Sequence, residues 1–183
     1  MGKVRIIGGL YRSRVLSFKD NASGLRPTPD RVRETVFNWL GQDLSGKVCL
    51  DLFAGSGALG FEAVSRNAKH VTLVESDADI ARDLRLNQER LNAANLEITQ
   101  RNALAYLSMC TLQFDVIFLD PPYESGLLQQ SLDAIAVSEV LVKNGTIYIE
   151  YRSAPDVALY DIVKHGKAGA VNYALLQIKM KDL

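Results

Sequence analysis

The stretch "DPPY" at residues 120–123 directly follows the apolar run "FDVIFL" and combines residue types suited to chemistry on a planar amine. Two consecutive prolines fix two backbone φ angles and remove two N–H donors, so this segment is stiff. A carboxylate and a carbonyl held in place can accept hydrogen bonds from an exocyclic amino group and leave its lone pair aimed at an electrophile. A neighbouring tyrosine can stack on a base. We therefore predict that Asp120, Pro121, Pro122 and Tyr123 form a catalytic platform that clamps an unpaired or extruded base.

A second group of residues with chemical potential lies in "DLFAGSGALG" at residues 51–60, where three glycines spell G-x-G-x-x-G. Glu75 follows Gly55 by 20 residues, which matches the dinucleotide-binding pattern and makes a NAD-dependent oxidoreductase one interpretation. Asp51 argues against that interpretation, because its carboxylate would repel a pyrophosphate. The same carboxylate would attract the cationic groups of S-adenosylmethionine, while Glu75 could bind the ribose hydroxyls.

Apolar runs alternate with helical patterns from residue 47 onward, which predicts a parallel sheet covered by helices on both faces. The last two strands are joined by only a few residues, so the final strand must run antiparallel. The sequence thus predicts an α/β, Rossmann-like fold with a mostly parallel seven-stranded sheet and an antiparallel last strand. The expected strands are 47–53, 70–75, 96–100, 114–120, 145–151, 161–166 and 171–180, and the expected helices are 58–67, 77–94, 102–109, 126–142 and 155–161.

The carboxyl ends of parallel strands meet at one edge of a sheet, where ligands of open α/β sheets bind. Asp51, Glu75 and Asp120 each stand at such an end in the expected arrangement. We therefore expect these three carboxylates to face one crevice.

The first 41 residues form a different kind of segment. "VRIIGG" and "SRVLSF" can pair as a hairpin, and a helix is expected within "RPTPDRVRETVFNWLG", with Thr28 as its N-cap and Pro29 as its first residue. The predicted organisation is an N-terminal extension at 1–41 and a larger domain at 42–183.

Charge is distributed unevenly along the chain although its formal net charge is zero. Residues 1–33 carry eight basic and two acidic side chains, whereas the remainder carries 13 basic and 19 acidic ones. Such an asymmetry indicates a polyanionic partner for the N-terminal segment. For Arg33 and its neighbour Glu34, a structural ion pair is an alternative. The residues expected to bind phosphates are Arg5, Arg12, Arg14, Arg26, Arg31 and Arg33.

Several classes of protein do not fit the sequence. No apolar stretch approaches the length of a membrane span, and the N-terminus lacks the pattern of a secretory signal. Cys49 and Cys110 are isolated in apolar surroundings, and His70 and His165 have no partner at metal-ligand spacing. We therefore expect a cytoplasmic protein without a metal site and without contact to membranes.

Four segments together are similar to one known family: "RIIGG" at 5–9, "LRPTPDRVRETVFNWL" at 25–40, "DLFAGSGALGFEAVSR" at 51–66 and "DPPY" at 120–123. They resemble the bacterial 16S rRNA guanine-N2 methyltransferase family RsmD, whose members have the class I methyltransferase fold. The resemblance implies methyl transfer from S-adenosylmethionine to N2 of guanine 966 in 16S rRNA on the assembling small ribosomal subunit, by a protein expected to be a monomer. It implies cofactor contacts for Asp51, Phe53, Ala54, Gly55, Gly57 and Glu75, and an adenine contact for Asn102.

Other functions share part of this logic. An adenine-N6 or cytosine-N4 methyltransferase acting on nucleic acid, or a protein glutamine methyltransferase, would use the platform in the same way. A non-catalytic RNA-binding assembly factor is a further alternative, although it would have no use for three carboxylates around a cofactor crevice.

Overall fold

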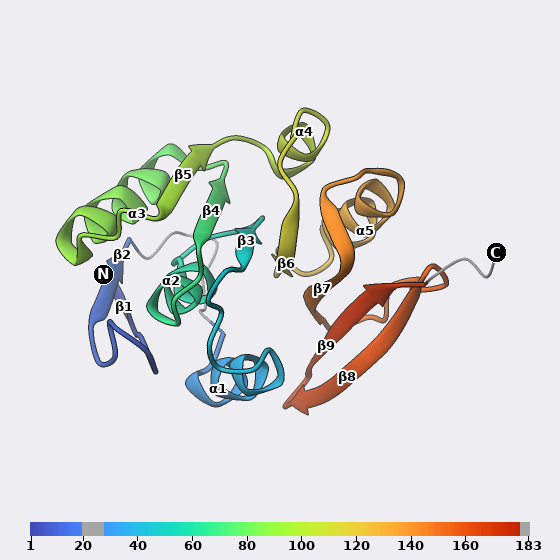
Figure 1. Ribbon diagram of the computed structural model, residues 1–183, viewed down its shortest axis with the longest axis horizontal. Coiled ribbons are helices and arrows are strands. Elements are labelled where there is room, and N and C mark those ends of the chain that lie inside the picture. The colour runs from blue at the N-terminus through green and yellow to red at the C-terminus, as the bar shows by residue number, and fades with distance from the viewer. Residues whose placement is uncertain (20–27, 180–183) are drawn as a thin grey trace.

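The computed structural model describes residues 1–19 and 28–179. Figure 1 shows the helices and strands of this part of the chain. In chain order they are β1 (Gly2–Arg5), β2 (Val15–Phe18), α1 (Asp30–Trp39), β3 (Val48–Asp51), α2 (Ala58–Ser65), β4 (His70–Glu75), α3 (Ala78–Leu91), β5 (Leu96–Gln100), α4 (Ala103–Leu107), β6 (Phe114–Leu119), α5 (Leu127–Val137), β7 (Leu141–Tyr151), β8 (Tyr160–Ala168) and β9 (Val171–Ile178).

The central element is a seven-stranded sheet with the strand order β5-β4-β3-β6-β7-β9-β8 (Figure 1). Strands β5, β4, β3, β6 and β7 run parallel to their neighbours. The last strand, β9, lies between β7 and β8 and is antiparallel to both. The predicted fold class, a mostly parallel seven-stranded sheet with an antiparallel last strand, is confirmed.

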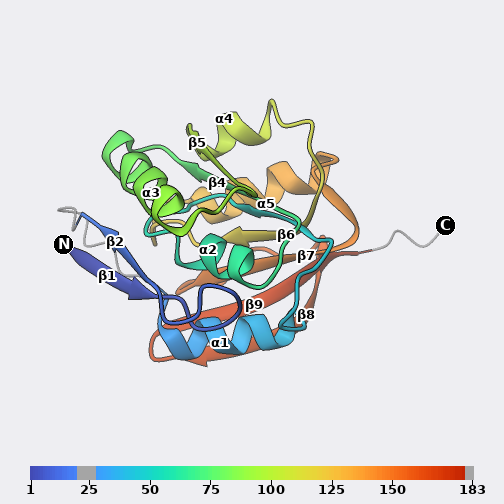
Figure 2. The same cartoon turned by 60° about the vertical axis from the view of Figure 1, so that its left-hand side comes forward.

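Helices cover both faces of the sheet, as the parallel arrangement requires. Helices α1, α2 and α3 contribute to one buried apolar cluster, and α4 and α5 contribute to a second cluster on the opposite face (Figures 1 and 2). In the described part of the chain, no helix is long and apolar enough to span a bilayer.

Helix α3 illustrates how local sequence sets the element boundaries. The side chain of Asp77 accepts hydrogen bonds from the backbone N–H groups of Asp79 (2.8 Å) and Ile80 (3.1 Å), which caps the first turn. Asn92 ends the helix in the left-handed conformation, with φ of 57°. The helix is therefore shorter than the expected range of 77–94.

The predicted N-terminal hairpin is present, with β1 antiparallel to β2. Side chains of the larger domain bind its backbone: Asn87 of α3 accepts from Ser17 N (3.2 Å) and donates to Ser17 O (2.9 Å). Glu62 of α2 likewise accepts from Ile7 N (2.8 Å) and Gly8 N (2.9 Å). Residues 1–41 thus contact the larger domain through specific hydrogen bonds, and the proposed boundary at residue 41 stays a prediction.

Three expectations at the level of elements were wrong. The helix expected at 155–161 is absent, because the Asp156 side chain accepts from Ala158 N (2.8 Å) and stabilises a turn in place of a helix. The helix expected to reach residue 142 ends at Val137, and β7 already begins at Leu141. Pro29, and not Thr28, occupies the N-cap position of α1.

Candidate active site

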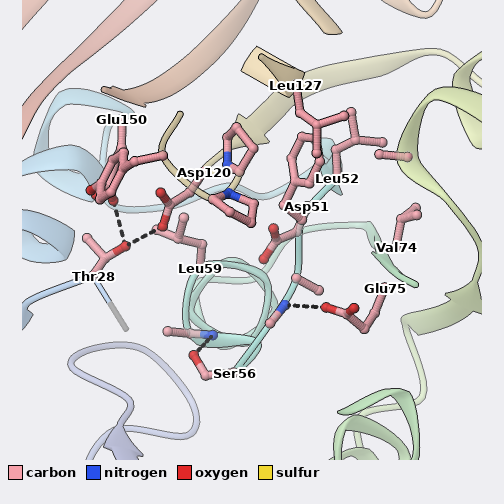
Figure 3. A pocket seen from close by; sticks show the side chains of 18 of the residues that line it. Thr28, Asp51, Leu52, Ser56, Leu59, Val74, Glu75, Asp120, Leu127 and Glu150 are labelled. Atoms are coloured by element: carbon pink, nitrogen blue, oxygen red, sulfur yellow. Dashed lines mark hydrogen bonds between the residues drawn. The ribbon is translucent and has the colours of Figure 1, made fainter. Parts of the chain in front are cut away.

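The carboxyl ends of β3, β4, β6 and β7 surround a cavity of about 940 Å³, a volume within the range of cofactor and substrate pockets. Figure 3 shows many of the side chains that line it, with Asp120 and Glu150 on one side, Glu75 on the other and Asp51 between them. The expectation that Asp51, Glu75 and Asp120 face one crevice is therefore confirmed.

The glycine-rich turn between β3 and α2 forms one wall of this cavity, with contributions from Phe53, Ala54 and Gly55. Gly57 has a φ of 77°, and a Cβ atom there would lie 2.7 Å from atoms of both Leu84 and Phe61. A glycine is required because any side chain would be strained in conformation and would clash with the core. Gly57 therefore lets the turn pack tightly on the core, and it is not itself among the residues that line the cavity.

Glu75 is held in a defined orientation at the end of β4. Its carboxylate accepts hydrogen bonds from Gly55 N (3.0 Å) and from Asp77 N (2.8 Å). Oε2 keeps one lone pair for a further donor, whereas Oε1 also accepts from the Ser76 hydroxyl at 3.4 Å. The side chain can accept hydrogen bonds from two vicinal ribose hydroxyls once one of them replaces the long Ser76 contact.

Asp51 is a buried carboxylate, with 2% of its surface exposed. It accepts a hydrogen bond from Gly60 N (3.0 Å), but burial raises the pKa of Asp51 to about 7, and the charge of Glu75 adds to the effect. A cation bound beside it would favour the ionised form. The amino and sulfonium groups of S-adenosylmethionine are such cations, so the residues present fit this cofactor.

Asn102 lines the cavity at the start of α4, but its carbonyl oxygen is already engaged. The Oδ1 atom accepts from Leu104 N (3.0 Å) and Ala105 N (3.2 Å) and thereby caps the helix. The remaining amide N–H groups are donors. Asn102 is therefore suited to donate to a ring nitrogen of adenine, and less suited to accept from its amino group.

The platform at residues 120–123 lies in the cavity wall after β6. Pro121 is buried, and Pro122 is exposed but accepts a hydrogen bond at its carbonyl from the Ser125 hydroxyl (2.6 Å). The guanidinium carbon of Arg152 lies 4.6 Å from the centre of the Tyr123 ring. The platform is thus supported from its own turn and from the segment after β7.

Two residues that the sequence did not single out also belong to this site. Thr28 and Glu150 have exposed fractions of 5% and 4%, and the Thr28 hydroxyl lies 2.6 Å from Glu150 Oε1 and 3.5 Å from Asp120 Oδ2 (Figure 3). The Tyr148 hydroxyl donates to the same Glu150 oxygen (2.8 Å). The only signal in the sequence was Thr28 itself, in "RPT", which resembled a helix cap.

Arg33 was expected to bind phosphates, and the structure corrects this. Its side chain is 0% exposed and donates to the carbonyls of Thr28 (3.1 Å) and Arg5 (2.8 Å) and to Asp30 (2.6 Å). Its Nη1 atom also lies 3.5 Å from Glu62. A guanidinium buried in this way cannot reach RNA. Arg33 is therefore a structural residue, in agreement with the alternative that it forms a structural ion pair.

The other basic residues of the N-terminal segment have different surroundings. Arg5, Arg12, Arg14 and Arg31 are exposed. Arg5 is in a solvent-exposed ion pair with Asp30 (3.3 Å). Arg26 lies outside the described residues. Among residues 1–19 and 28–179, no cluster of His, Cys, Asp and Glu has the arrangement of a metal site.

Together, the strand order, the glycine-rich turn and the platform beside the cavity define a class I methyltransferase. The chain belongs to the family described as Conserved hypothetical protein 95, whose sequence model matches residues 4–177. This is the family to which the four sequence segments pointed, since its relatives include Ribosomal RNA small subunit methyltransferase D of Escherichia coli. That relative is 41% identical over 180 residues, covering 96% of this chain and 90% of the relative. The protein of the same name from Haemophilus influenzae is 41% identical over 183 residues, covering 96% and 94%.

Solved structures agree with this classification. The Escherichia coli structure named yhhF superposes with a TM-score of 0.89 at 40% identity, covering 98% of this chain and 100% of that one. A Salinibacter ruber RNA methyltransferase in complex with S-adenosyl-L-homocysteine has a TM-score of 0.69 at 16% identity, covering 86% and 97%. At that low identity the likeness concerns the fold alone.

Proposed function

We propose that the protein transfers a methyl group from S-adenosylmethionine to the exocyclic N2 of a guanine in 16S rRNA, guanine 966 by family resemblance. The observation that carries this proposal is the platform at residues 120–123 beside a cofactor cavity, in a chain 41% identical over 96% of its length to Ribosomal RNA small subunit methyltransferase D. Its proposed setting is the assembling small subunit in the cytoplasm, where it acts as a monomer.

The bound cofactor supplies an electrophilic methyl group on a sulfonium. Asp51 attracts its cationic end, and Glu75 binds its ribose through hydroxyl hydrogen bonds. Phe53, Ala54 and Gly55 shape the wall against which it lies, in keeping with their places around the cavity, and Gly57 gives the turn the conformation that this wall requires.

The platform acts on the guanine. Its amino nitrogen is a poor nucleophile, because the lone pair is delocalised into the ring. Asp120 and the carbonyl of Pro121 accept the two N–H bonds, which favours rehybridisation and directs the lone pair toward the methyl group. Tyr123 stacks on the base and fixes its plane, and Pro122 keeps the segment stiff.

The exposed arginines of the N-terminal segment bind the RNA backbone. Arg5, Arg12, Arg14 and Arg31 are accessible for this role, and Arg26 retains it as a prediction. Phosphate contacts position the RNA without reading its sequence. The pocket around the platform therefore determines the specificity for guanine.

The test is methyl transfer to small-subunit particles purified from cells that lack this protein. We expect one methyl group on N2 of a single guanine, dependent on S-adenosylmethionine and unaffected by NAD. Asp120→Ala should lose most of the turnover while binding S-adenosylhomocysteine normally, and Asp120→Asn should retain more activity because the amide keeps one acceptor oxygen. Methylation at any other atom, or full activity of Asp120→Ala, would contradict the proposal.

A further inference from the structure

A hydroxyl joins two carboxyl groups in the site, and nothing in the proposed chemistry so far uses this arrangement. Thr28 Oγ1 lies 2.6 Å from Glu150 Oε1 and 3.5 Å from Asp120 Oδ2. Thr28 and Glu150 come from positions 122 residues apart and are almost completely buried. Placing a half-buried and a buried carboxyl group so close together is costly unless their protons and charges are arranged in a specific way.

The hydrogen bonds define that arrangement. A threonine hydroxyl has one proton and can donate to one acceptor at a time. The shorter contact assigns this proton to Glu150, which also accepts from the Tyr148 hydroxyl at 2.8 Å. Two donors on one carboxylate oxygen favour its ionised form. Asp120 then faces a lone pair of Thr28 and, beyond it, a negative charge.

We propose that Thr28 and Glu150 are positioning residues that act through Asp120 and keep it basic enough to take up the proton that guanine N2 releases. This inference rests on the proposed function. The N2 lone pair forms the bond to the methyl carbon, and the methyl–sulfur bond breaks with its electron pair left on sulfur. One proton of the resulting N2 cation passes to the ionised Asp120 carboxylate, which gives the neutral methylamino group.

The electrostatic surroundings support this role. Burial raises the pKa of Asp120 well above its ordinary value, and the charges of Glu150 and then Asp51 raise it further. Burial also raises the pKa of Glu150, but the hydrogen bonds of Thr28 and Tyr148 lower it. Of the pair, Glu150 is therefore the group that ionises first. The titratable and charged groups around this pair are Asp51, Tyr123, Tyr148, Arg152 and Arg33.

Arg33 gives Thr28 its fixed place. Its Nε atom donates to the Thr28 carbonyl at 3.1 Å from within α1, and its own position is fixed by Asp30 and Glu62. Arg33 also donates to the Arg5 carbonyl (2.8 Å), so the N-terminal segment is connected to Asp120 through Arg33 and Thr28.

The test is the pH dependence of single-turnover methyl transfer, followed from pH 5 to 9 with small-subunit particles that lack the modification. Glu150→Gln removes a negative charge near Asp120 and should move the acid limb of the profile to lower pH by about one unit, or about tenfold in rate on that limb. Thr28→Val removes a donor that keeps Glu150 ionised and also removes the lone pair that faces Asp120, so Asp120 ionises more easily and the limb should move to lower pH. Thr28→Ser keeps the hydroxyl and should restore the wild-type profile.

Two further measurements separate a tuning role from a structural one. Tyr148→Phe keeps the ring but removes one donor to Glu150, so it should move the acid limb in the same direction as Glu150→Gln and by less. Binding of S-adenosylhomocysteine, measured by calorimetry, should be unchanged in all four variants. Equal loss of rate at every pH, with no shift of the limb in any variant, would overturn the inference. If the wild-type protein does not methylate guanine N2, the proposed function is wrong. If the wild type methylates guanine N2 but no variant shifts the acid limb, only the role of Thr28 and Glu150 is wrong.

Discussion

Tyr123 has two ring faces, and the protein itself occupies one of them. Arg152 lies over the ring with its guanidinium carbon 4.6 Å from the centroid. Such a cation–π contact contributes about 0.5–1 kcal/mol at exposed sites. It holds the ring in place without substrate, so a stacked base would have to use the opposite face.

This arrangement predicts different effects for two substitutions. Tyr123→Ala should weaken productive binding of the RNA by about 1–3 kcal/mol, the contribution of a stacked base. Tyr123→Phe keeps the ring and should have little effect. Both are measured as the RNA concentration dependence of single-turnover methyl transfer. Equal loss in the two variants would mean that the hydroxyl, and not stacking, is what matters.

A second prediction at the residue scale concerns Asp51, whose pKa burial raises to about 7. The folded protein therefore holds this proton more tightly than the unfolded chain, so stability contributed by the protonated group is present at low pH and lost as pH rises through 7. Without cofactor, Asp51→Asn should raise the free energy of unfolding by about 1–3 kcal/mol at pH 8. The raised pKa corresponds to about 4 kcal/mol, and part of this gain is lost because the buried amide is imperfectly hydrogen-bonded.

Thermal unfolding of the two proteins at pH 5 and pH 8 checks this, since the gain should largely vanish at the lower pH. The same variant should bind S-adenosylhomocysteine more weakly than the wild type at pH 8. A variant that is destabilised at both pH values, with normal cofactor binding, would show that Asp51 is a structural acceptor for Gly60 N and no more.

Sequence reasoning found those site residues that belong to local motifs. Gly55, Glu75 and Asp120 could be placed because strand ends of a parallel sheet converge, whatever the details of packing. Thr28 and Glu150 could not, since their contact joins positions 122 residues apart and no short pattern encodes it. Thr28 also satisfied the local rules for a helix cap, and the tertiary contact overrode them.

At the scale of elements, α1 depends on a buried charge network. Glu62 of α2 is fully buried and contacts Arg33 (3.5 Å) and Arg66 (2.9 Å), and it also accepts from the backbone of Ile7 and Gly8. One carboxylate thus joins α1, α2 and the loop that follows β1. Removing a cation from such a network leaves a buried charge with insufficient compensation.

We therefore expect Arg33→Met to destabilise the protein by about 3–5 kcal/mol, the usual effect of breaking a buried ion pair. Arg31→Met is the matched control, because Arg31 is exposed on the same helix, and it should change stability by less than about 0.5 kcal/mol. Urea unfolding of both variants decides the matter. Similar stability of the two would mean that Glu62 is satisfied by Arg66 and the backbone alone.

The elements themselves were predictable to different degrees. Strands β4 and β5 begin and end at the expected residues, because each is a short run rich in β-branched or aliphatic residues between two helical patterns. The region around residues 138–160 was not predictable in the same way. There β7 begins four residues early through an irregular pairing with β6, and Asp156 forms a turn in place of a helix. Both features arise from contacts that a periodic pattern does not encode.

At the scale of the whole molecule, the basic N-terminal segment is fixed to the face of the sheet that α2 and α3 cover. Its backbone is bound by Glu62 and Asn87, so its arginines are presented from a rigid framework. Thr28 and Pro29, directly before α1, line the cavity, and Thr28 contacts Glu150 there. We expect RNA bound by the segment to come within reach of this cavity.

Charge reversal tests this placement. Arg12→Glu combined with Arg14→Glu should weaken binding of the small-subunit particle by at least tenfold at low salt, because counterion release drives phosphate contacts and both side chains are exposed. The control is Lys164→Glu with Lys167→Glu, which changes charge equally on β8, a strand far along the chain at the edge of the sheet. Cofactor affinity should be the same in all three proteins.

The affinity of the wild type for the small-subunit particle should also fall steeply as salt is raised. The slope of log Kd against log salt should be smaller in the Arg12 and Arg14 variant, because two phosphate contacts are lost. If instead the β8 variant loses as much affinity as the N-terminal one, the RNA contacts the molecule through general electrostatics and not through the N-terminal segment.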